Sequence, residues 1–133
     1  MTLDEARAAI PRLRPLLSDL RGAYHAWRQA REELDEIVRL HGDAVFEQDL
    51  PDSKDARRLR DDLTHLTARV DGILAQVDAL GAEVKDPIMG LVDFYATREG
   101  ETVYLCYRDD EPTLDHWHPL ATGFAGRRPL AEF

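Results

Sequence analysis

The sequence has a single cysteine and no long apolar run, and these two absences restrict its class. Because one thiol cannot form an internal disulfide, the composition fits a reducing compartment. Residues 1–5 lack the basic and apolar regions of a secretion signal. No stretch approaches the ~20 apolar residues that cross a bilayer. We therefore predict a cytoplasmic protein with no membrane partner.

Positive charge is also scarce. The 133 residues include 17 Lys and Arg against 26 Asp and Glu, which gives a formal net charge of −9. Nucleic-acid binding depends on basic side chains that neutralise phosphates, and an anionic membrane surface repels an acidic protein. The charge balance therefore argues against both partners and favours a soluble protein.

Apolar residues recur at alternating spacings of three and four through the first two thirds of the chain. This spacing keeps one face of a helix against a partner helix. Two series follow it, namely Leu3, Ala6, Ile10, Leu13, Leu17, Leu20, Tyr24, Trp27, Arg31, Leu34, Val38, His41 and Val45, and then Ala56, Leu59, Leu63, Leu66, Val70, Ile73, Val77, Leu80 and Val84. They predict a long antiparallel helical hairpin, coiled-coil-like, over residues 1–84.

Local signals set the ends of the predicted helices. Thr2 and Glu5 have the spacing of a capping box. Pro11 removes an amide donor and clashes with the preceding turn, so we expect it to end or kink a short first helix. The turn between the two long helices precedes a cap at Asp52 or Ser53.

A two-helix arm leaves much of each helix uncovered. Helices in water are stabilised mainly by packing, so the arm needs more cover than one partner helix provides. Self-association into a four-helix bundle would supply it, and the alternative is that the C-terminal segment folds back over the arm. We predict a homodimer formed through the helices.

The hydrophobic period changes to two after Gly81. Three segments rich in β-branched and aromatic residues, separated by turn-forming residues, predict strands at Leu91–Thr97, Thr102–Arg108 and Thr113–His118. The fold class is therefore α+β in one domain, residues 1–133. The helical hairpin occupies 1–84, and a small three-stranded antiparallel β-meander with its tail occupies 85–133.

A two-residue turn at Glu99-Gly100 fixes the register of the first two strands, because glycine supplies the positive φ that this turn needs. The register pairs Asp93 with Cys106, Phe94 with Leu105, and Tyr95 with Tyr104. One face of the ribbon is then apolar, and we expect it to pack on the helices. The other face is polar.

The register of the third strand stays open. A four-residue loop places Leu114, His116 and His118 on the apolar face. A five-residue loop, or a bulge, reverses the faces and brings both histidines next to Cys106 and Asp93. The alternation of Leu114 with the core favours the first arrangement.

The second arrangement would gather metal-ligating side chains on the polar face. Carboxylate, thiolate and imidazole groups bind zinc, iron, manganese and related divalent transition metals, and the chain offers Asp93, Cys106, His116 and His118. His118, with Asp93 as its partner, is the best single candidate for a ligand or an acid-base group. The alternative is that the histidines are packed structural side chains and Cys106 a half-buried strand residue.

Arg108 and Arg127 are candidates for anion binding, because a guanidinium group binds phosphate or carboxylate through two parallel hydrogen bonds. The alternative, which we favour, is that they form salt bridges with acidic residues of this chain, namely Asp109, Asp110, Glu111 and Glu132. The glycines of segment 123–127 do not make a phosphate loop, because the following Lys-Ser/Thr pair is missing.

Several segments of the chain resemble one family. They are Thr2–Ala6, Leu13–Leu17, Val84–Pro87, Gly90–Phe94, Val103–Arg108, Glu111-Pro112, Trp117-His118 and Gly123–Arg127. Through them the chain is similar, over nearly its whole length, to the small prokaryotic proteins known as domain of unknown function 2203. The resemblance implies no reaction, substrate or cofactor.

Two classes of function follow from these patterns. The first is a homodimeric interaction or structural module, in which the helices assemble and the polar face of the meander recognises a partner. The second is a metal-binding protein centred on Asp93 and His118, with a metal-dependent hydrolase as one form of it. Whether the protein is an enzyme stays open at this level.

Overall fold

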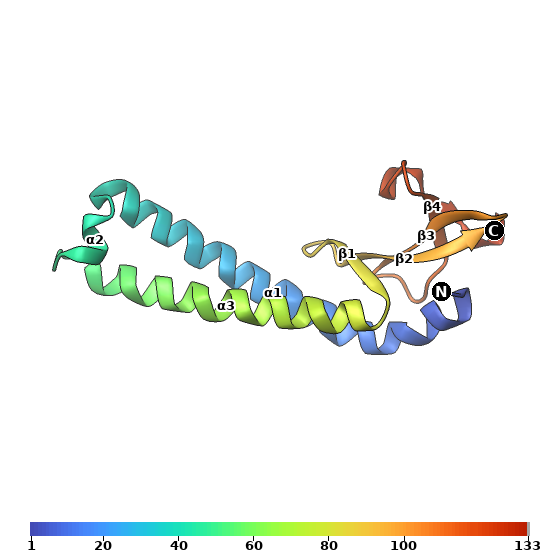
Figure 1. Ribbon diagram of the computed structural model, residues 1–133, viewed down its shortest axis with the longest axis horizontal. Coiled ribbons are helices and arrows are strands. Elements are labelled where there is room, and N and C mark those ends of the chain that lie inside the picture. Colours follow the sequence, from blue (N-terminus) through green and yellow to red (C-terminus); the bar gives the residue numbers. More distant parts are fainter. Residues whose placement is uncertain (133) are drawn as a thin grey trace. The chain divides into compact units, whose positions relative to one another are not determined.

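The computed structural model describes residues 1–132 (Figure 1). Their contacts divide the chain into two compact units. The sheet unit contains Met1–Arg21 and the chain from Ile73 onward, and the helical unit contains Gly22–Gly72. The fold is α+β, with a long helical region followed by an antiparallel sheet. None of the described helices combines the length and the apolar character needed to span a membrane.

Helix α1 (Leu3–His41) begins at the predicted capping box. The amide of Glu5 donates to Thr2 Oγ1 at 3.1 Å, and the Thr2 hydroxyl donates to Glu5 Oε1 at 3.0 Å. The acidic residues of the first turn also favour this end of the helix, where backbone amide groups carry partial positive charge.

The prediction of a short first helix ended by Pro11 is wrong. Helix α1 contains 39 residues, and both Pro11 and Pro15 lie inside it. Both prolines are exposed, so water can hydrate the carbonyl groups that have lost their amide partners. Leu13 and Leu17, on the other side of the helix, are almost completely buried, and this packing holds the helix together across the prolines.

After α1 the chain passes through the short helix α2 (Ala44–Glu47) and enters α3 (Ser53–Ala79). Ser53, one of the two predicted caps, is fully buried. Its hydroxyl accepts a hydrogen bond from the amide of Leu50 at 2.9 Å and donates to the carbonyl of Gln48 at 2.8 Å. The side chain therefore closes the turn that precedes α3.

Helix α3 ends before the last apolar residue of the predicted seam. Gly81 has a φ of +84°, a conformation that favours glycine and commonly ends helices. Strand β1 (Ala82–Asp86) follows at once. Val84, which the spacing assigned to the helical seam, instead pairs with Val92 of β2 (Leu91–Arg98).

The sheet has five strands, not the three that the sequence predicts. After β1 and β2 come β3 (Glu101–Arg108), β4 (His116–Pro119) and β5 (Arg128–Pro129), all antiparallel to their neighbours in the order β1-β2-β3-β4-β5. The short 3-10 helices η1 (Phe124–Gly126) and η2 (Leu130–Glu132) flank β5. Both additional strands lie at the edges. Strand β1 was not predicted because Val84 continues the three-four spacing of the helix before it, and β5 was not predicted because two residues are too few to show a period.

The register between β2 and β3 is the predicted one. Asp93 pairs with Cys106, Phe94 with Leu105, and Tyr95 with Tyr104. The connecting residues Glu99 and Gly100 have φ values of +50° and +81°, as a two-residue turn with two positive φ angles requires. A single turn therefore fixes which side chains share each face.

The arrangement that we favoured for the third strand is wrong. Cys106 pairs with His116, Leu105 with Trp117, and Tyr104 with His118, so both histidines lie on the polar face. Leu114 is fully buried, but it belongs to the loop before β4, and its burial does not set the phase of the strand.

The apolar face of the sheet carries the core of the sheet unit. It consists of buried side chains from β2, β3 and β4, namely Val92, Phe94, Ala96, Val103, Leu105, Tyr107 and Trp117. Helix α1 contacts this face, because Arg14 Nε donates to the hydroxyl of Tyr107 at 2.9 Å. The same unit contains the buried residues Ile10, Leu13 and Leu17 of α1, which is consistent with the predicted packing of the apolar face on the helix. The polar face carries the candidate site.

Candidate metal centre

Three metal-ligating side chains meet on the polar face of the sheet. Asp93 comes from β2, Cys106 from β3 directly opposite it, and His118 from β4. Their ligand atoms all lie within 4.8 Å of one another. Asp93 and His118 are 2% exposed and Cys106 is 0% exposed. The group is hereafter called the Asp-Cys-His site.

The contacts of the His118 ring fix where its hydrogen lies. Nδ1 is 2.8 Å from the carbonyl oxygen of Pro119, and a carbonyl only accepts, so Nδ1 must carry the hydrogen and donate. Nε2 faces Asp93, at 3.2 Å from both carboxylate oxygens. A second proton, or a cation, is needed between Nε2 and these oxygens, because a lone pair and a carboxylate repel each other.

Burial raises the pKa of the Asp93 carboxyl, and the nearby His118 and the hydrogen bond with Cys106 partly oppose this effect. Burial also raises the pKa of the Cys106 thiol to about 12, and the neighbouring Asp93 carboxylate adds to the effect. The thiol is therefore protonated at neutral pH. It does not act as a thiolate nucleophile unless a positive charge replaces the proton.

The site is not arranged as a nucleophile-histidine-acid triad. In such a triad one imidazole nitrogen contacts the nucleophile and the other contacts the acid. Here the two nitrogens of His118 contact the Pro119 carbonyl and Asp93, so neither is placed to take the proton of Cys106. The three side chains converge on a common point instead.

Two tyrosines and a lysine lie on the same face beside His118. The rings of Tyr104 and His118 have centroids 5.2 Å apart. Lys85 Nζ lies 4.5 Å from the centre of the Tyr104 ring and donates to the Tyr104 hydroxyl at 3.2 Å, and Tyr104 in turn donates to Tyr95 at 2.9 Å. The hydrogen bond with Tyr104 raises the pKa of Tyr95 to about 12.

Lys85, Tyr95 and Tyr104 were not among the predicted site residues. The predicted pairing of Tyr95 with Tyr104 was the sequence signal that could have placed these two tyrosines beside the site. Lys85 could not be found in the same way, because it lies in β1, which was taken for the end of a helix. Its pKa is raised by the hydrogen bond to Glu83, at 2.7 Å.

His116, the fourth predicted ligand, is not part of the Asp-Cys-His site. It pairs with Cys106 in the register, but its Nδ1 lies 3.0 Å from Glu111 Oε2. Its side chain is 34% exposed, against 2% for that of His118. The structure therefore brings three of the four predicted ligands together and directs the fourth toward a loop.

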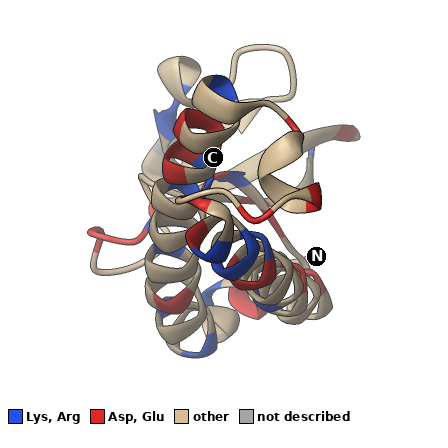
Figure 2. Ribbon diagram, turned by 90° about the vertical axis from the view of Figure 1, so that its left-hand side faces the viewer, with Lys and Arg blue, Asp and Glu red and all other residues tan. Residues whose placement is uncertain are grey.

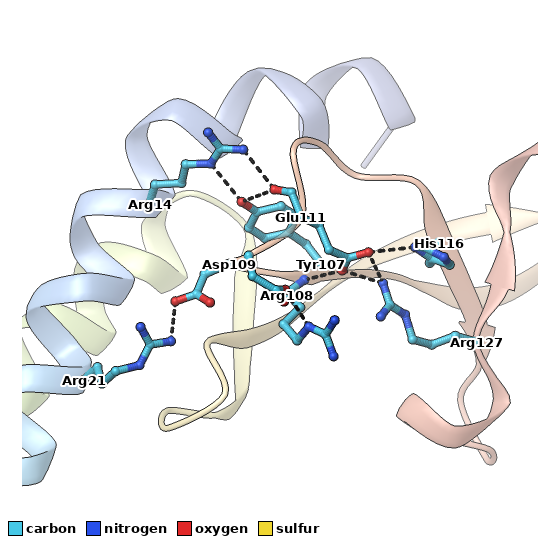
Figure 3. Close-up of polar contacts among 9 residues, drawn as sticks. Arg14, Arg21, Tyr107, Arg108, Asp109, Glu111, His116 and Arg127 are labelled. Carbon is cyan, nitrogen blue, oxygen red and sulfur yellow. Dashed lines mark hydrogen bonds and ion pairs between the residues drawn. The ribbon is translucent and has the colours of Figure 1, made fainter.

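The two predicted anion-binding arginines contact carboxylates of this chain. Arg108 Nε donates to Asp110 Oδ1 at 2.5 Å, and Arg127 Nη2 lies 2.5 and 2.7 Å from the two oxygens of Glu111 (Figure 3). The side chain of Glu132, another predicted partner, lies outside the described part. Both guanidinium groups therefore have an acidic partner within the chain.

The donor set indicates which ion it could hold. Thiolate, imidazole and carboxylate together are typical of zinc and of borderline transition metals, whereas calcium and magnesium prefer oxygen donors alone. The Nδ1 hydrogen bond to a backbone carbonyl is also the usual outer contact of a histidine that binds metal through Nε2.

Comparison with known proteins gives a family but no activity. A model of the family described as "Uncharacterized conserved protein (DUF2203)" matches residues 1–130. A search of curated proteins and a search of solved structures each returned no match to this chain.

Proposed function

The chain belongs to the DUF2203 family, whose description names no reaction, and we propose from the site itself that the protein binds a divalent transition metal. The ligands are Asp93 through a carboxylate oxygen, Cys106 through Sγ and His118 through Nε2. Among the ions that suit this donor set, zinc fits best, with iron and manganese as the alternatives.

The orientation of His118 carries the proposal. A buried histidine without a ligand could turn either nitrogen toward its surroundings. Here a backbone carbonyl holds Nδ1 as the donor, so Nε2 is directed at the Asp93 carboxylate with a thiol nearby. This is the preorganisation that a metal ligand needs, and the outer contact that maintains it is already formed.

Charge balance also supports a divalent ion. With the thiol protonated and one proton shared between His118 and Asp93, the three side chains have a net charge of zero. Replacing both protons by one divalent cation gives thiolate, carboxylate, neutral imidazole and metal, which again sum to zero. A buried site can therefore exchange protons for the ion without gaining the net charge that burial penalises.

The bound ion would join β2, β3 and β4. Three protein donors also leave one position of a tetrahedral ion for water, and a zinc-bound water is acidic enough to act as a nucleophile near neutral pH. A metal-dependent hydrolase is therefore the enzymatic form of this proposal. Ester and phosphoester hydrolysis by the metal-loaded protein is the activity to assay first.

Elemental analysis tests metal binding directly. Protein should be purified without chelator and without a histidine tag, then dialysed after incubation with Zn²⁺. We expect one ion per chain in the wild type and loss of that ion in His118→Ala. His116→Ala is the matched control, because it removes a histidine of the same strand that lies outside the site, and it should retain the ion. A metal-free wild type, or stoichiometric metal in His118→Ala, would refute the proposal.

A second observation supports the predicted helical arm and homodimer. In the helical unit, five large apolar residues of the seam are only half-buried, namely Tyr24, Trp27, Leu63, Leu66 and Val70. Trp27 Nε1 donates to Thr67 Oγ1 at 3.1 Å, and these two residues line a cavity of about 180 Å³ together with Tyr24 and Val70. We propose that α1 and α3 form a coiled-coil-like hairpin here. We also propose that a second copy of the chain covers these five residues, which form an apolar strip.

Light scattering after gel filtration tests the dimer. Val70→Glu places a charge in the apolar strip and should convert a dimer into a monomer. Ala68→Glu adds the same charge at an exposed position of the same helix and should leave the dimer intact. A monomeric wild type at high micromolar concentration would contradict the proposal.

The expected partners and location remain proposals as well. Lys and Arg are interspersed with Asp and Glu along the helices (Figure 2), and the net charge of the chain is −9. This distribution offers little to a phosphate backbone, so we propose that nucleic acid is not the partner. A reduced thiol as ligand further fits the proposed cytoplasmic location.

A further inference from the structure

One carboxylate, that of Glu111, gathers four contacts beside the Asp-Cys-His site. Figure 3 shows its contacts with His116 and Arg127. Arg127 Nη2 lies 2.5 and 2.7 Å from its two oxygens, and the backbone amide of Arg108 donates to Oε1 at 2.8 Å. His116 Nδ1 is 3.0 Å from Oε2. The side chains of Glu111 and Arg127 are 13% and 12% exposed, so water screens their attraction weakly.

Arg127 ends the segment 119–127, and the same segment begins with the carbonyl that orients His118. The Pro119 carbonyl accepts hydrogen bonds from His118 Nδ1 at 2.8 Å and from the amide of Thr122 at 3.3 Å. Near its other end, the guanidinium of Arg127 lies 4.7 Å from the centre of the Phe124 ring. His116, which pairs with Cys106 in the register of β3 and β4, has its Nδ1 3.0 Å from Glu111 Oε2, so the Glu111–Arg127 pair lies next to the strand that carries the site.

The donors cannot be reached from solvent in this arrangement. Asp93, Cys106 and His118 are each at most 2% exposed, so an ion reaches them only if part of the structure opens. Local opening of a segment requires the loss of the contacts that hold it, and charge-assisted hydrogen bonds in a partly buried pair are among the strongest.

We propose that the Glu111–Arg127 pair is a latch that holds segment 119–127 closed at the Asp-Cys-His site and so controls how fast the metal enters and leaves. This inference rests on the proposed metal binding for its biological meaning. The opening itself does not require a metal and can be measured without one. In this view Glu111 and Arg127 are positioning residues that act on His118 and Cys106 through the segment between them.

Thiol labelling of metal-free protein measures the opening. The chain has a single cysteine, Cys106, so labelling by a disulfide reagent reports access to the site alone. Glu111→Gln removes the charge of the latch, and we expect labelling to become about tenfold to hundredfold faster. Asp110→Asn is the matched control: Asp110 pairs with Arg108 on the same loop but is 62% exposed, so its labelling rate should change by about twofold or less.

Arg127→Gln provides the second variant. It removes the other partner of the latch and should accelerate labelling to a similar extent, and the double variant should be no faster than either single one. Global stability is measured by urea unfolding of the same proteins. An unchanged labelling rate in Glu111→Gln refutes the latch. The latch is also refuted if the factor by which labelling accelerates matches the factor by which the equilibrium constant for global unfolding rises, because access then depends on unfolding of the whole chain.

Zinc release separates this inference from the proposal on which it rests. Metal-loaded protein is mixed with a chromogenic chelator, and we expect zinc to leave Glu111→Gln about tenfold faster or more, and Asp110→Asn at the wild-type rate. A wild type that holds zinc but releases it at the same rate as Glu111→Gln refutes the latch and leaves metal binding intact. A wild type that binds no zinc, with labelling accelerated in Glu111→Gln, refutes metal binding and supports the opening.

Discussion

Binding of a divalent ion should release about two protons per chain. The first comes from the Cys106 thiol, because burial raises its pKa to about 12. The second lies between His118 Nε2 and the Asp93 carboxylate, since Nδ1 already donates to a carbonyl. Both must leave before sulfur, nitrogen and oxygen can bind the ion. Protons compete with the metal, so binding weakens as the pH falls.

The size of this effect follows from the number of protons and from the thiol. While both are held, the apparent affinity should rise about hundredfold per pH unit, because each released proton contributes a factor of about ten. With a thiol pKa of about 12, removing the proton of Cys106 at pH 7 costs about 7 kcal/mol, at about 1.4 kcal/mol per pH unit. Zinc-finger peptides bind zinc with about 10–16 kcal/mol at pH 7 after losing the protons of their own thiols, and the higher thiol pKa here adds about 5 kcal/mol to that cost, so zinc can still displace the proton at neutral pH.

Isothermal titration calorimetry measures the protons directly. The observed enthalpy is plotted against the ionisation enthalpy of several buffers at one pH, and the slope is the number of protons released. Cys106→Ser is the control, because a serine hydroxyl stays protonated; this variant should release one proton fewer and bind more weakly. Stoichiometric zinc binding by the wild type with no proton release would refute the assignment of the ligands.

Four further substitutions test which local features stabilise the fold. In urea unfolding, Gly90→Ala should lower the free energy of unfolding by more than about 1 kcal/mol, because Gly90 has a φ of +68° and an added Cβ would overlap the side chain of Asp109. In the same assay Gly22→Ala should stabilise helix α1 by about 0.5–1 kcal/mol, because the added Cβ has open space around it. Tyr107→Phe should cost about 1 kcal/mol by urea unfolding, because the buried hydroxyl accepts from Arg14 at 2.9 Å and donates to a carbonyl at 3.1 Å, and a cost near zero would show that these bonds contribute no net stability. Pro15→Ala should raise the thermal unfolding midpoint, since alanine restores an amide donor inside helix α1, and a lower midpoint would show that the proline is needed there.

The parts of the fold that were predicted correctly are those set by local chemistry. The Glu99-Gly100 turn fixes the β2–β3 register by its backbone conformation alone, and Asp93 therefore faces Cys106 as expected. The capping box at Thr2 and Glu5 is likewise a property of four residues. In both cases no distant contact competes with the local preference, which is why sequence alone was sufficient.

Tertiary contacts decide the register of β4, which was predicted wrongly. Leu114 is buried through its loop, where Arg14 Nη2 donates to the neighbouring Pro112 carbonyl and Arg7 Nε donates to the carbonyl of Leu114 itself. Its burial therefore says nothing about the phase of β4, and the favoured register failed for this reason. Because a shift of one residue moves every side chain to the other face, this single loop decided whether His118 joined Asp93.

The role of Glu111 could not be derived from the sequence for a related reason. Glutamate in an acidic loop is usually a solvated charge, and the sequence offered four acidic partners for two arginines. Only the path of segment 119–127 selects Glu111 for Arg127, and His116, which pairs with Cys106, contacts the same carboxylate. Recognition of such a pair requires the tertiary structure, because its members are 16 residues apart and neither belongs to a periodic pattern.

The buried side chains of Asp93, Cys106 and His118 have two alternative roles: they are metal ligands, or they form a hydrogen-bonded network that stabilises the fold. The stability of the metal-free protein distinguishes the two. Replacing a buried ionic pair by apolar side chains of similar size is often neutral or stabilises a protein by about 1–4 kcal/mol. We therefore expect the triple variant Asp93→Leu, Cys106→Ala, His118→Leu to be at least as stable as the metal-free wild type in urea unfolding. Zinc at about 1,000 times its dissociation constant should then raise the stability of the wild type alone, by about 4 kcal/mol. If the metal-free wild type is clearly more stable than the triple variant, the three side chains stabilise the fold through their own hydrogen bonds. Their burial then needs no metal to explain it.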